Sequence, residues 1–330
     1  MKYVFVLLAI SFPSVANSQV SLAGLLPPHI EAIATGISDT GIVAGWLVDL
    51  EGQQKGWSLN LLNNQVFLLE TPRPGQQSVA WGVSGMVGSD LLLVGSIGQG
   101  PTRPALWGAE GELKFSLPQK GFFTDVRNGL MGQTYAALTV GDGSLYRLEV
   151  RDGRFFPLDG DDRLKPVQTS RISSGGDISG QLLDRHSGNL VAGFWRKDRA
   201  TTAFVPLNAL YPGGRGEALA VNRRRTVVGW SEDANGDWVA TVWTRKSNWT
   251  PFRIGLPRPG ADSQANDIDN AGTVVGAVGI EAFIWRLGEL DLSSLPSPPN
   301  AEYAEARAIS SFGRIVGFAS INRRLTPIIW

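Results

Sequence analysis

One short pattern of apolar and polar residues recurs along most of the chain. In most copies an alternating apolar stretch leads to a Ser/Asn-x-x-Gly sequence, and a β-branched run ending in glycine follows; in one copy Arg225 stands in place of the first glycine. Alternation and β-branched residues favour strands, whereas Ser, Asn and Gly favour the turn between them. The pattern therefore predicts repeated pairs of antiparallel strands. The clearest copies span residues 37–45, 172–180, 221–229, 268–276 and 309–317, with a stretched copy at 83–95 and a shortened one at 126–132.

Each copy continues into a third predicted strand that carries an aromatic residue, and then into a fourth strand followed by a proline-rich link. The repeat length is about 45 residues, the period of a four-stranded propeller blade. We therefore predict an all-β fold, a seven-bladed β-propeller of four-stranded antiparallel blades, with the eroded third unit as the least certain blade. The aromatic positions are Trp57, Trp107, Tyr146, Trp195, Trp243, Trp285 and Trp330.

The repeated tryptophans are interpreted as anchors packed between adjacent blades, because a repeated core needs one large apolar residue per unit. The alternative is a stripe that binds sugars or aromatic ligands. Trp46, Trp230 and Phe318 share one place in their units and are also interpreted as packing residues. Three tryptophans fall outside the register of the repeat and are not assigned by this argument: Trp81, Trp238 and Trp249.

The last unit ends at Trp330, its third strand, so one strand is missing there. Residues 20–28 resemble residues 290–296, a fourth strand with its proline exit. We therefore predict that Gln19 to Leu22 supplies the outer strand of the last blade, which would close the ring and leave no blade incomplete.

The first 18 residues have the pattern of an export signal. A basic start precedes a nine-residue, mostly apolar run, and small residues at Ala16 and Ser18 fit cleavage before Gln19. A membrane anchor is the alternative, but the run is about half of the roughly 20 residues needed to span a bilayer. The prediction is a signal over residues 1–18, a single propeller domain over residues 19–330, and a periplasmic or extracellular protein without a transmembrane segment after signal removal.

Composition excludes several kinds of chemistry. Thirty basic residues balance thirty acidic residues, which argues against nucleic acid as a partner. The chain has no cysteine and only two histidines, His29 and His186, so thiolate metal sites and cysteine nucleophiles are excluded and a histidine triad is nearly so. Nucleophile-elbow and phosphate-loop motifs are absent from the sequence. We assign no catalytic, cofactor-binding or metal-binding residue, and we predict no cofactor.

The units resemble those of extracellular HAF-repeat proteins, in which A-x-x-[IV]-N-x-x-G-x-V-V-G precedes a His-Ala-Phe-Leu-Trp-like strand. The likeness is best over residues 265–276 with 281–285, and it extends over most of residues 33–330. Glu281, Val239 and Val191 stand where the name-giving histidine would fall. The resemblance implies an exported repeat fold and brings no settled activity with it.

Two acidic segments are candidates for metal binding. Asp233, Asn235 and Asp237 alternate as the opening ligands of a calcium loop do, but the distal glutamate of such a loop is missing. An ordinary Asx-rich hairpin turn is the favoured interpretation. Asp159, Asp161 and Asp162 are interpreted in the same way, as a solvated connection.

Two arginine clusters, 223–225 and 323–324, fall in turns predicted to lie on opposite faces of the ring, so we do not expect them to form one anion patch. The long links between blades open on one face near the axis, and loops on a rigid scaffold often carry function. Charged loops that only keep the protein in solution are the favoured interpretation of these links, and the alternative is a protein or glycan ligand on that face. The link residues considered for it are Arg73, Arg163, Tyr211, Arg215 and Arg258.

Three functions remain open from the sequence. The first is a non-catalytic binding or scaffold module for a protein or glycan. The second is a glycan hydrolase or lyase that uses two carboxylates on different blades. The third is a structural subunit of an envelope assembly, which would present a large apolar patch.

Overall fold

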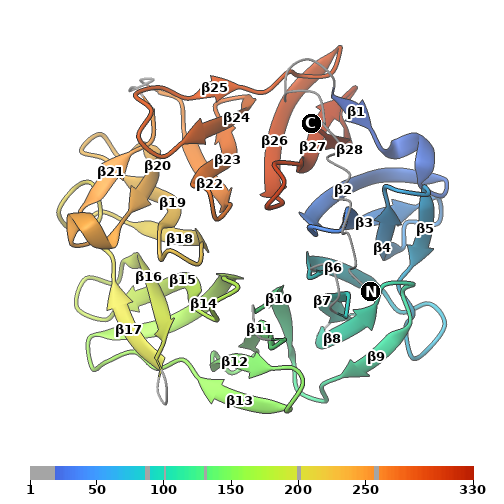
Figure 1. The fold of residues 1–330 in the computed structure, drawn as a ribbon, viewed down its shortest axis with the longest axis horizontal. Coiled ribbons are helices and arrows are strands. Elements are labelled where there is room, and N and C mark those ends of the chain that lie inside the picture. Colours follow the sequence, from blue (N-terminus) through green and yellow to red (C-terminus); the bar gives the residue numbers. More distant parts are fainter. Residues whose placement is uncertain (1–18, 86–89, 100–101, 130–131, 199–201, 256–259) are drawn as a thin grey trace, which may run out of the picture.

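The computed structural model describes residues 19–85, 90–99, 102–129, 132–198, 202–255 and 260–330. The predicted signal, residues 1–18, lies outside the described residues. The described strands form seven four-stranded antiparallel sheets arranged as a ring (Figure 1). The predicted seven-bladed β-propeller is therefore confirmed.

Each blade runs from an inner strand at the axis to an outer strand at the rim. Blade 1 contains β2 (His29–Ile37), β3 (Ile42–Asp49), β4 (Gln54–Asn60) and β5 (Gln65–Leu68). Blade 2 contains β6 (Ser78–Val83), β7 (Leu92–Ile97), β8 (Arg103–Gly108) and β9 (Leu113–Ser116). Blade 3 contains β10 (Gly121–Asn128), β11 (Thr134–Val140), β12 (Leu145–Glu149) and β13 (Arg154–Pro157). Blade 4 contains β14 (Leu164–Ile172), β15 (Ile178–Asp184), β16 (Leu190–Lys197) and β17 (Thr202–Pro206).

The remaining blades follow the same order. Blade 5 contains β18 (Gly216–Val221), β19 (Val227–Glu232), β20 (Trp238–Trp243) and β21 (Pro251–Arg253). Blade 6 contains β22 (Ser263–Ile268), β23 (Thr273–Val278), β24 (Glu281–Arg286) and β25 (Ser293–Ser294). Blade 7 contains β26 (Ala301–Ile309), β27 (Ile315–Ile321), β28 (Arg324–Ile329) and, from the start of the chain, β1 (Val20–Ser21). Two short 3-10 helices, η1 (Ala23–Leu25) and η2 (Arg245–Ser247), lie in connections.

The N-terminal strand closes the ring as predicted. β1 pairs antiparallel with β28, with Val20 opposite Ile329. The next residue, Leu22, is buried, and its amide donates a 2.9 Å hydrogen bond to the carbonyl of Pro327. Each of the other six blades makes the same contact, in which the residue after the outer strand donates to the third strand at 2.8–3.0 Å. The N-terminus therefore reproduces a complete blade. The six equivalent donors are Leu69, Leu117, Leu158, Leu207, Ile254 and Leu295.

The repeated tryptophans pack between blades, which confirms the anchor interpretation. Trp57, Trp107, Trp195 and Trp243 are fully buried. The indole N–H of Trp195 donates at 2.8 Å to the carbonyl of Asp159 in the preceding link, and Trp107, Trp243 and Trp330 make the equivalent bond. These four tryptophans tie their blades to the exit of the previous blade, whereas the indole N–H of Trp285 donates to the carbonyl of Glu289 in its own blade.

The third blade is complete although its motif is eroded. Four paired strands are present, and Tyr146 takes the place of the tryptophan, edge-on to Phe155 with ring centroids 6.1 Å apart. Among the tryptophans outside the register, Trp249 packs on Phe194 and Trp238 stacks on Trp230 at 4.2 Å. Trp81 takes part in neither of these ring contacts and instead lines a pocket at the ring axis.

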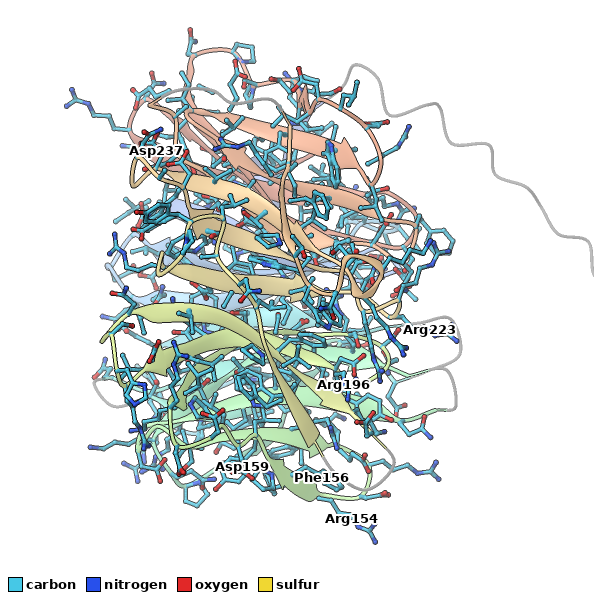
Figure 2. All side chains as sticks on the ribbon, turned by 90° about the vertical axis from the view of Figure 1, so that its left-hand side faces the viewer. Arg154, Phe156, Asp159, Arg196, Arg223 and Asp237 are labelled. Carbon is cyan, nitrogen blue, oxygen red and sulfur yellow. The ribbon has the colours of Figure 1, made fainter. Side chains whose placement is uncertain are left out.

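The connections define two faces of the ring. The link face carries the links between blades and the turns between second and third strands; the turn face carries the turns between first and second strands. Figure 2 shows Asp237, in a second-to-third turn, on one side of the disc and Arg223, in a first-to-second turn, on the other. In the described part of the chain, no helix has the length and apolar character needed to cross a bilayer.

Candidate binding pocket on the ring axis

A β-bulge interrupts every inner strand at the same place. The register between first and second strands shifts within Ala34–Gly36 of blade 1 and at the matching point of all other blades. A bulge leaves an extra residue unpaired and turns the strand locally. The bulged residues are Thr35, Trp81, Thr124, Ser170, Leu219, Asn266 and Arg307, all of which line one pocket on the ring axis.

Arg171 lies with Ser170 within the register shift of blade 4, and its side chain extends across the axis. Its Nη2 donates to the backbone carbonyl of Arg307 in blade 7 at 2.7 Å and to that of Thr35 in blade 1 at 3.2 Å. Because its side chain is only 14% exposed, this guanidinium is part of the interior. Arg171 therefore connects three blades at the centre of the ring.

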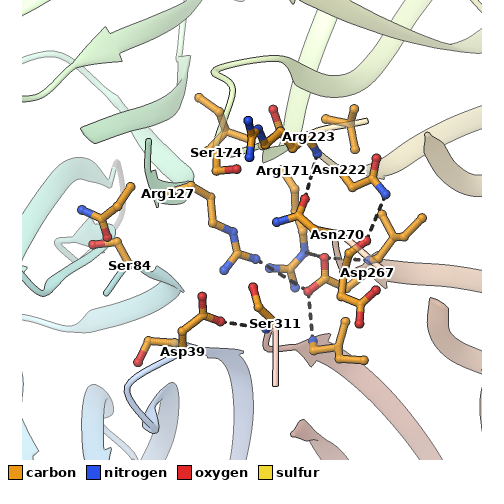
Figure 3. Close-up of a pocket in the computed structure, with 18 of the residues that line it drawn as sticks. Asp39, Ser84, Arg127, Arg171, Ser174, Asn222, Arg223, Asp267, Asn270 and Ser311 are labelled. Atoms are coloured by element: carbon orange, nitrogen blue, oxygen red, sulfur yellow. Dashed lines mark hydrogen bonds and ion pairs between the residues drawn. The ribbon is translucent and has the colours of Figure 1, made fainter. Parts of the chain in front are cut away.

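Two aspartates compensate the charge of this arginine. Asp125 and Asp267 lie 3.9 and 3.8 Å from its guanidinium nitrogens, and Arg127 approaches the same two carboxylates at 3.4 and 3.6 Å. Asp125 accepts a hydrogen bond from the amide of Ile172, and Asp267 accepts one from the amide of Ile309. Burial raises the pKa of Asp125, and the two arginines oppose that rise. Figure 3 shows Arg127 and Arg171 converging with Asp267 at the axis.

This charged cluster separates the axial space into two pockets, and Arg171 lines both. The pocket on the link face has a volume of about 360 Å³ and the pocket on the turn face about 120 Å³. Only the first falls in the range of about 300–1,000 Å³ that is usual for small-ligand sites.

The link-face pocket has two chemically different walls. Blades 1 to 3 contribute Ile33, Trp81 and Phe122, which form an apolar side, and the hydroxyl groups of Thr35 and Thr124 lie beside them in the lining. Trp81 is 38% exposed, a large value for a tryptophan inside a ring of strands. Blades 4 to 7 contribute mainly polar groups, with Leu219 as the apolar exception. These polar residues are Gln168, Thr169, Ser170, Arg171, Glu217, Asn266 and Arg307.

Glu217 is the acidic residue of this lining. Its Oε1 accepts a 3.1 Å hydrogen bond from the hydroxyl of Ser170. Burial raises the pKa of Glu217, and the hydrogen bonds from Ser170 and Trp230 only partly oppose that rise. The neutral form of this carboxyl is therefore favoured over a wider pH range than in a solvated glutamate.

Glu305 occupies the equivalent position in blade 7 but has different surroundings. Its carboxylate accepts hydrogen bonds from Asn266 at 2.9 Å, Gln264 at 3.1 Å and Tyr303 at 2.8 Å, and it pairs with Arg307 at 3.0 Å. Burial and the nearby Glu305 raise the pKa of Tyr303, which keeps this phenol a hydrogen-bond donor. Arg307 therefore enters the pocket with its charge already compensated.

Polar contacts between neighbouring turns occupy much of the turn-face pocket. The side-chain amide of Asn222 donates to the backbone carbonyl of Asp269 at 2.9 Å. The backbone amide of Arg223 donates to the side chain of Asn270 at 3.1 Å, and the backbone amide of Ser311 donates to the carboxylate of Asp39 at 2.7 Å (Figure 3). These bonds join blade 5 to blade 6 and blade 7 to blade 1. We therefore interpret this pocket as structural.

The link residues considered from the sequence lie outside the axial pocket. Arg163 pairs with Asp184 at 2.7 Å and holds the pKa of that carboxyl well below its usual range, while Arg215 pairs with Glu232. Each ion pair joins the link to a turn of the blade that follows it. Arg73 and Tyr211 are exposed and do not contribute to the lining, and Arg258 lies outside the described residues.

The acidic segments form hydrogen-bonded turns. Asp233 accepts from the amides of Asn235 and Asp237 and pairs with Arg253 at 2.9 Å. Asp161 accepts from two backbone amides of its own loop. No group of three His, Asp or Glu residues in the described ranges is arranged to hold a metal ion.

The remaining sequence candidates are also separated. Arg225 pairs with Asp177 at 3.2 Å in a turn of the turn face, whereas Arg323 lies in the turn between β27 and β28. His29 bonds the carbonyl of Pro27 at the start of β2, and the amide of His186 bonds Asp184.

Sequence reasoning missed the residues that line the axial pocket. Most blades have a small residue before the bulge, with Phe123 of blade 3 as an exception, and an apolar residue after it, as in Ala34 and Ile37 or Ala265 and Ile268. The bulged residue between them differs in chemistry from blade to blade. This variation at one position of an otherwise regular repeat could have indicated the pocket from the sequence, because a role in packing would not require a different residue type in each blade.

Many solved structures share this fold, and two of them illustrate the likeness. A chain of the "Crystal Structure of Mitotic Checkpoint Complex" superimposes with a TM-score of 0.57 and 13% identity, covering 99% of this chain and 98% of that one. "YCF48 bound to D1 peptide" gives a TM-score of 0.54 and 13% identity, with 94% and 93% covered. At such identities the likeness establishes the propeller fold and nothing more. No family model and no curated protein matches the sequence.

Proposed function

We propose that this propeller is a binding module whose ligand enters the axial pocket from the link face. The observation that carries the proposal is the lining itself. The repeat holds the packing positions constant and varies the bulged positions, which bring an exposed tryptophan and several polar side chains together above a closed floor. Concave sites of this kind, with apolar walls and a few convergent polar groups, are typical of ligand binding.

The comparison structures add a precedent for the fold. The YCF48 structure is described as bound to a D1 peptide, so a propeller of this shape can hold a ligand. Export is the second part of the proposal, and it rests on the signal-like pattern of residues 1–18 and on the repeat motif shared with extracellular HAF-repeat proteins. N-terminal sequencing of the protein recovered from outside the cytoplasm, with Gln19 as the first residue, would support it.

A second candidate function is a carboxylate-dependent glycan hydrolase or lyase. The specific observation is that Glu217 and Glu305 occupy equivalent positions two blades apart, with burial favouring the neutral form of Glu217 and Arg307 pairing with Glu305. Such a difference between two carboxyl groups is what acid–base pairs require. Chain shortening of a bound glycan that is lost in Glu217→Gln would establish this function.

The absence of cysteine allows a direct test of the binding site. A single cysteine at Gln168, in the pocket lining, and another at Arg223, on the opposite face, can each be alkylated in an otherwise thiol-free chain. A thermal-shift screen of glycans and peptides would supply ligands. We expect a ligand to slow alkylation of Gln168→Cys and leave Arg223→Cys unchanged. Protection of Arg223→Cys alone, or no stabilising ligand in the screen, would contradict the proposed function.

A further inference from the structure

We propose that the link-face pocket binds the terminal sugar of a neutral glycan. This inference rests on the proposed function, because it names the ligand class of the same pocket. Three features of the pocket lead to it, namely its closed floor, its two-sided lining and its compensated charges.

The closed floor limits how a ligand can enter. Arg171 bridges Thr35 and Arg307 across the axis, and Asp125 and Asp267 hold its guanidinium in place. The axial space is therefore not a through-channel at this level. A volume of about 360 Å³ is at the lower end of the range for small-ligand sites. The end of a chain or a branch fits such a site better than a segment that must pass through it.

The two-sided lining matches the two-sided chemistry of a pyranose ring. A sugar presents C–H groups on the faces of its ring and hydroxyl groups around its edge. The indole of Trp81 and the ring of Phe122 provide apolar surfaces for a C–H face. Gln168, Glu217 and Asn266, on the other wall, provide donors and acceptors suited to hydroxyl groups.

The charges within the pocket leave little attraction for a charged ligand. Arg307 is paired with Glu305, and Arg171 lies between Asp125 and Asp267. Burial disfavours the ionised form of Glu217, the acidic group of the described lining. A ligand carboxylate or ammonium would lose hydration without gaining a free counter-charge, which is costly in a partly enclosed site. A neutral ligand avoids this cost.

Isothermal titration calorimetry with three sets of probes tests the inference. The first set contains neutral gluco-, xylo-, manno- and chito-oligosaccharides, the second contains oligogalacturonates and oligoalginates, and the third contains a mixed set of neutral and charged peptides. The protein is compared with Trp81→Ala and with a matched control, Trp238→Ala, since both tryptophans are 38% exposed but only Trp81 lines the pocket.

We expect at least one neutral oligosaccharide to bind, with affinity falling roughly tenfold in Trp81→Ala and changing by less than about twofold in Trp238→Ala.

Other outcomes separate the inference from the proposed function. If acidic oligosaccharides or peptides bind and Trp81→Ala abolishes that binding, the pocket is a ligand site and the inference of a neutral glycan is wrong. If neutral oligosaccharides bind equally well to Trp81→Ala and the unmodified protein, they bind elsewhere, and both the inference and the proposed site are wrong. If no probe binds at millimolar concentration, the neutral-glycan inference is overturned.

Discussion

The backbone amide of Leu22 donates to the carbonyl of Pro327, which joins the first residues of the propeller to the last blade. Leu22 is buried in the same core cluster as Trp57 of blade 1, so this residue also seals the junction between the last blade and the first. We expect Leu22→Ala to lower the free energy of unfolding by about 3 kcal/mol, and deletion of residues 19–25 to lower the melting temperature by roughly 10 °C or more. Leu25→Ala is the control, because Leu25 is 38% exposed and its loss should have little effect. Equal melting temperatures for the deletion and the intact chain would show that the ring closes without β1.

Substitution of Trp195 tests whether the hydrogen bond from its indole to the preceding link stabilises the contact between adjacent blades. Its N–H donates to the carbonyl of Asp159, whereas the buried N–H of Trp57 has no hydrogen-bond partner among the residues that the structure describes. Trp195→Phe removes ring volume and one hydrogen bond, but Trp57→Phe removes ring volume only. We expect urea denaturation to give a loss of stability about 1 kcal/mol larger for Trp195→Phe. Equal losses for both variants would mean that the hydrogen bond to the preceding link does not stabilise the ring.

The charged cluster around Arg171 leads to a prediction about the stability of the folded protein. Arg171→Met keeps a long side chain but leaves Asp125 and Asp267 with less positive charge nearby. Breaking such a buried pair on one side typically costs about 3–5 kcal/mol. We expect a loss of this size in equilibrium unfolding, and partial recovery when Asp125→Asn and Asp267→Asn are added to Arg171→Met. A loss below about 1 kcal/mol would show that the charged cluster does not hold the blades together.

The raised pKa of Glu217 leads us to expect a specific dependence of folding stability on pH. Its pKa is raised in the folded protein, so the folded state retains the proton at pH values where the unfolded state has released it. Stability is therefore lost as pH rises from the unfolded pKa through the folded pKa. Glu217→Gln removes this loss. We expect the urea midpoints of the two proteins to differ by a constant amount below about pH 4, and the variant to gain relative stability above it. A difference that stays constant from pH 3.5 to 8 would contradict the role of burial.

Much of the fold could be predicted because each blade repeats the same local instructions. The Ser/Asn-x-x-Gly turn, the β-branched second strand and the anchoring tryptophan recur often enough to set the period. The missing strand after Trp330 could then be found at Val20–Ser21, since an incomplete blade would expose unpaired backbone groups. The third blade was harder because Tyr146 replaces its tryptophan, yet the strand alternation around Leu138 and Leu148 still builds a core.

The site could be predicted only in part, for a physical reason. The sequence indicates the link face, but the direction of a side chain near a bulge depends on the register between first and second strands. The partners of the link residues also depend on strand pairing. Arg163 and Arg215 each pair with an acidic residue at a turn of the same blade, which keeps them away from the axial pocket. The bulge that turns Trp81 and Asn266 toward the axis appears only when the strands are paired.

A crystal structure of the protein with the tightest ligand from the screen tests the central claim most directly. The predicted result is a ligand on the ring axis at the link face, stacked on Trp81, within hydrogen-bond distance of Glu217 and stopped by Arg171. A ligand held instead at the turn face beside Arg223, or at the rim of the disc beside Tyr211, would contradict the account.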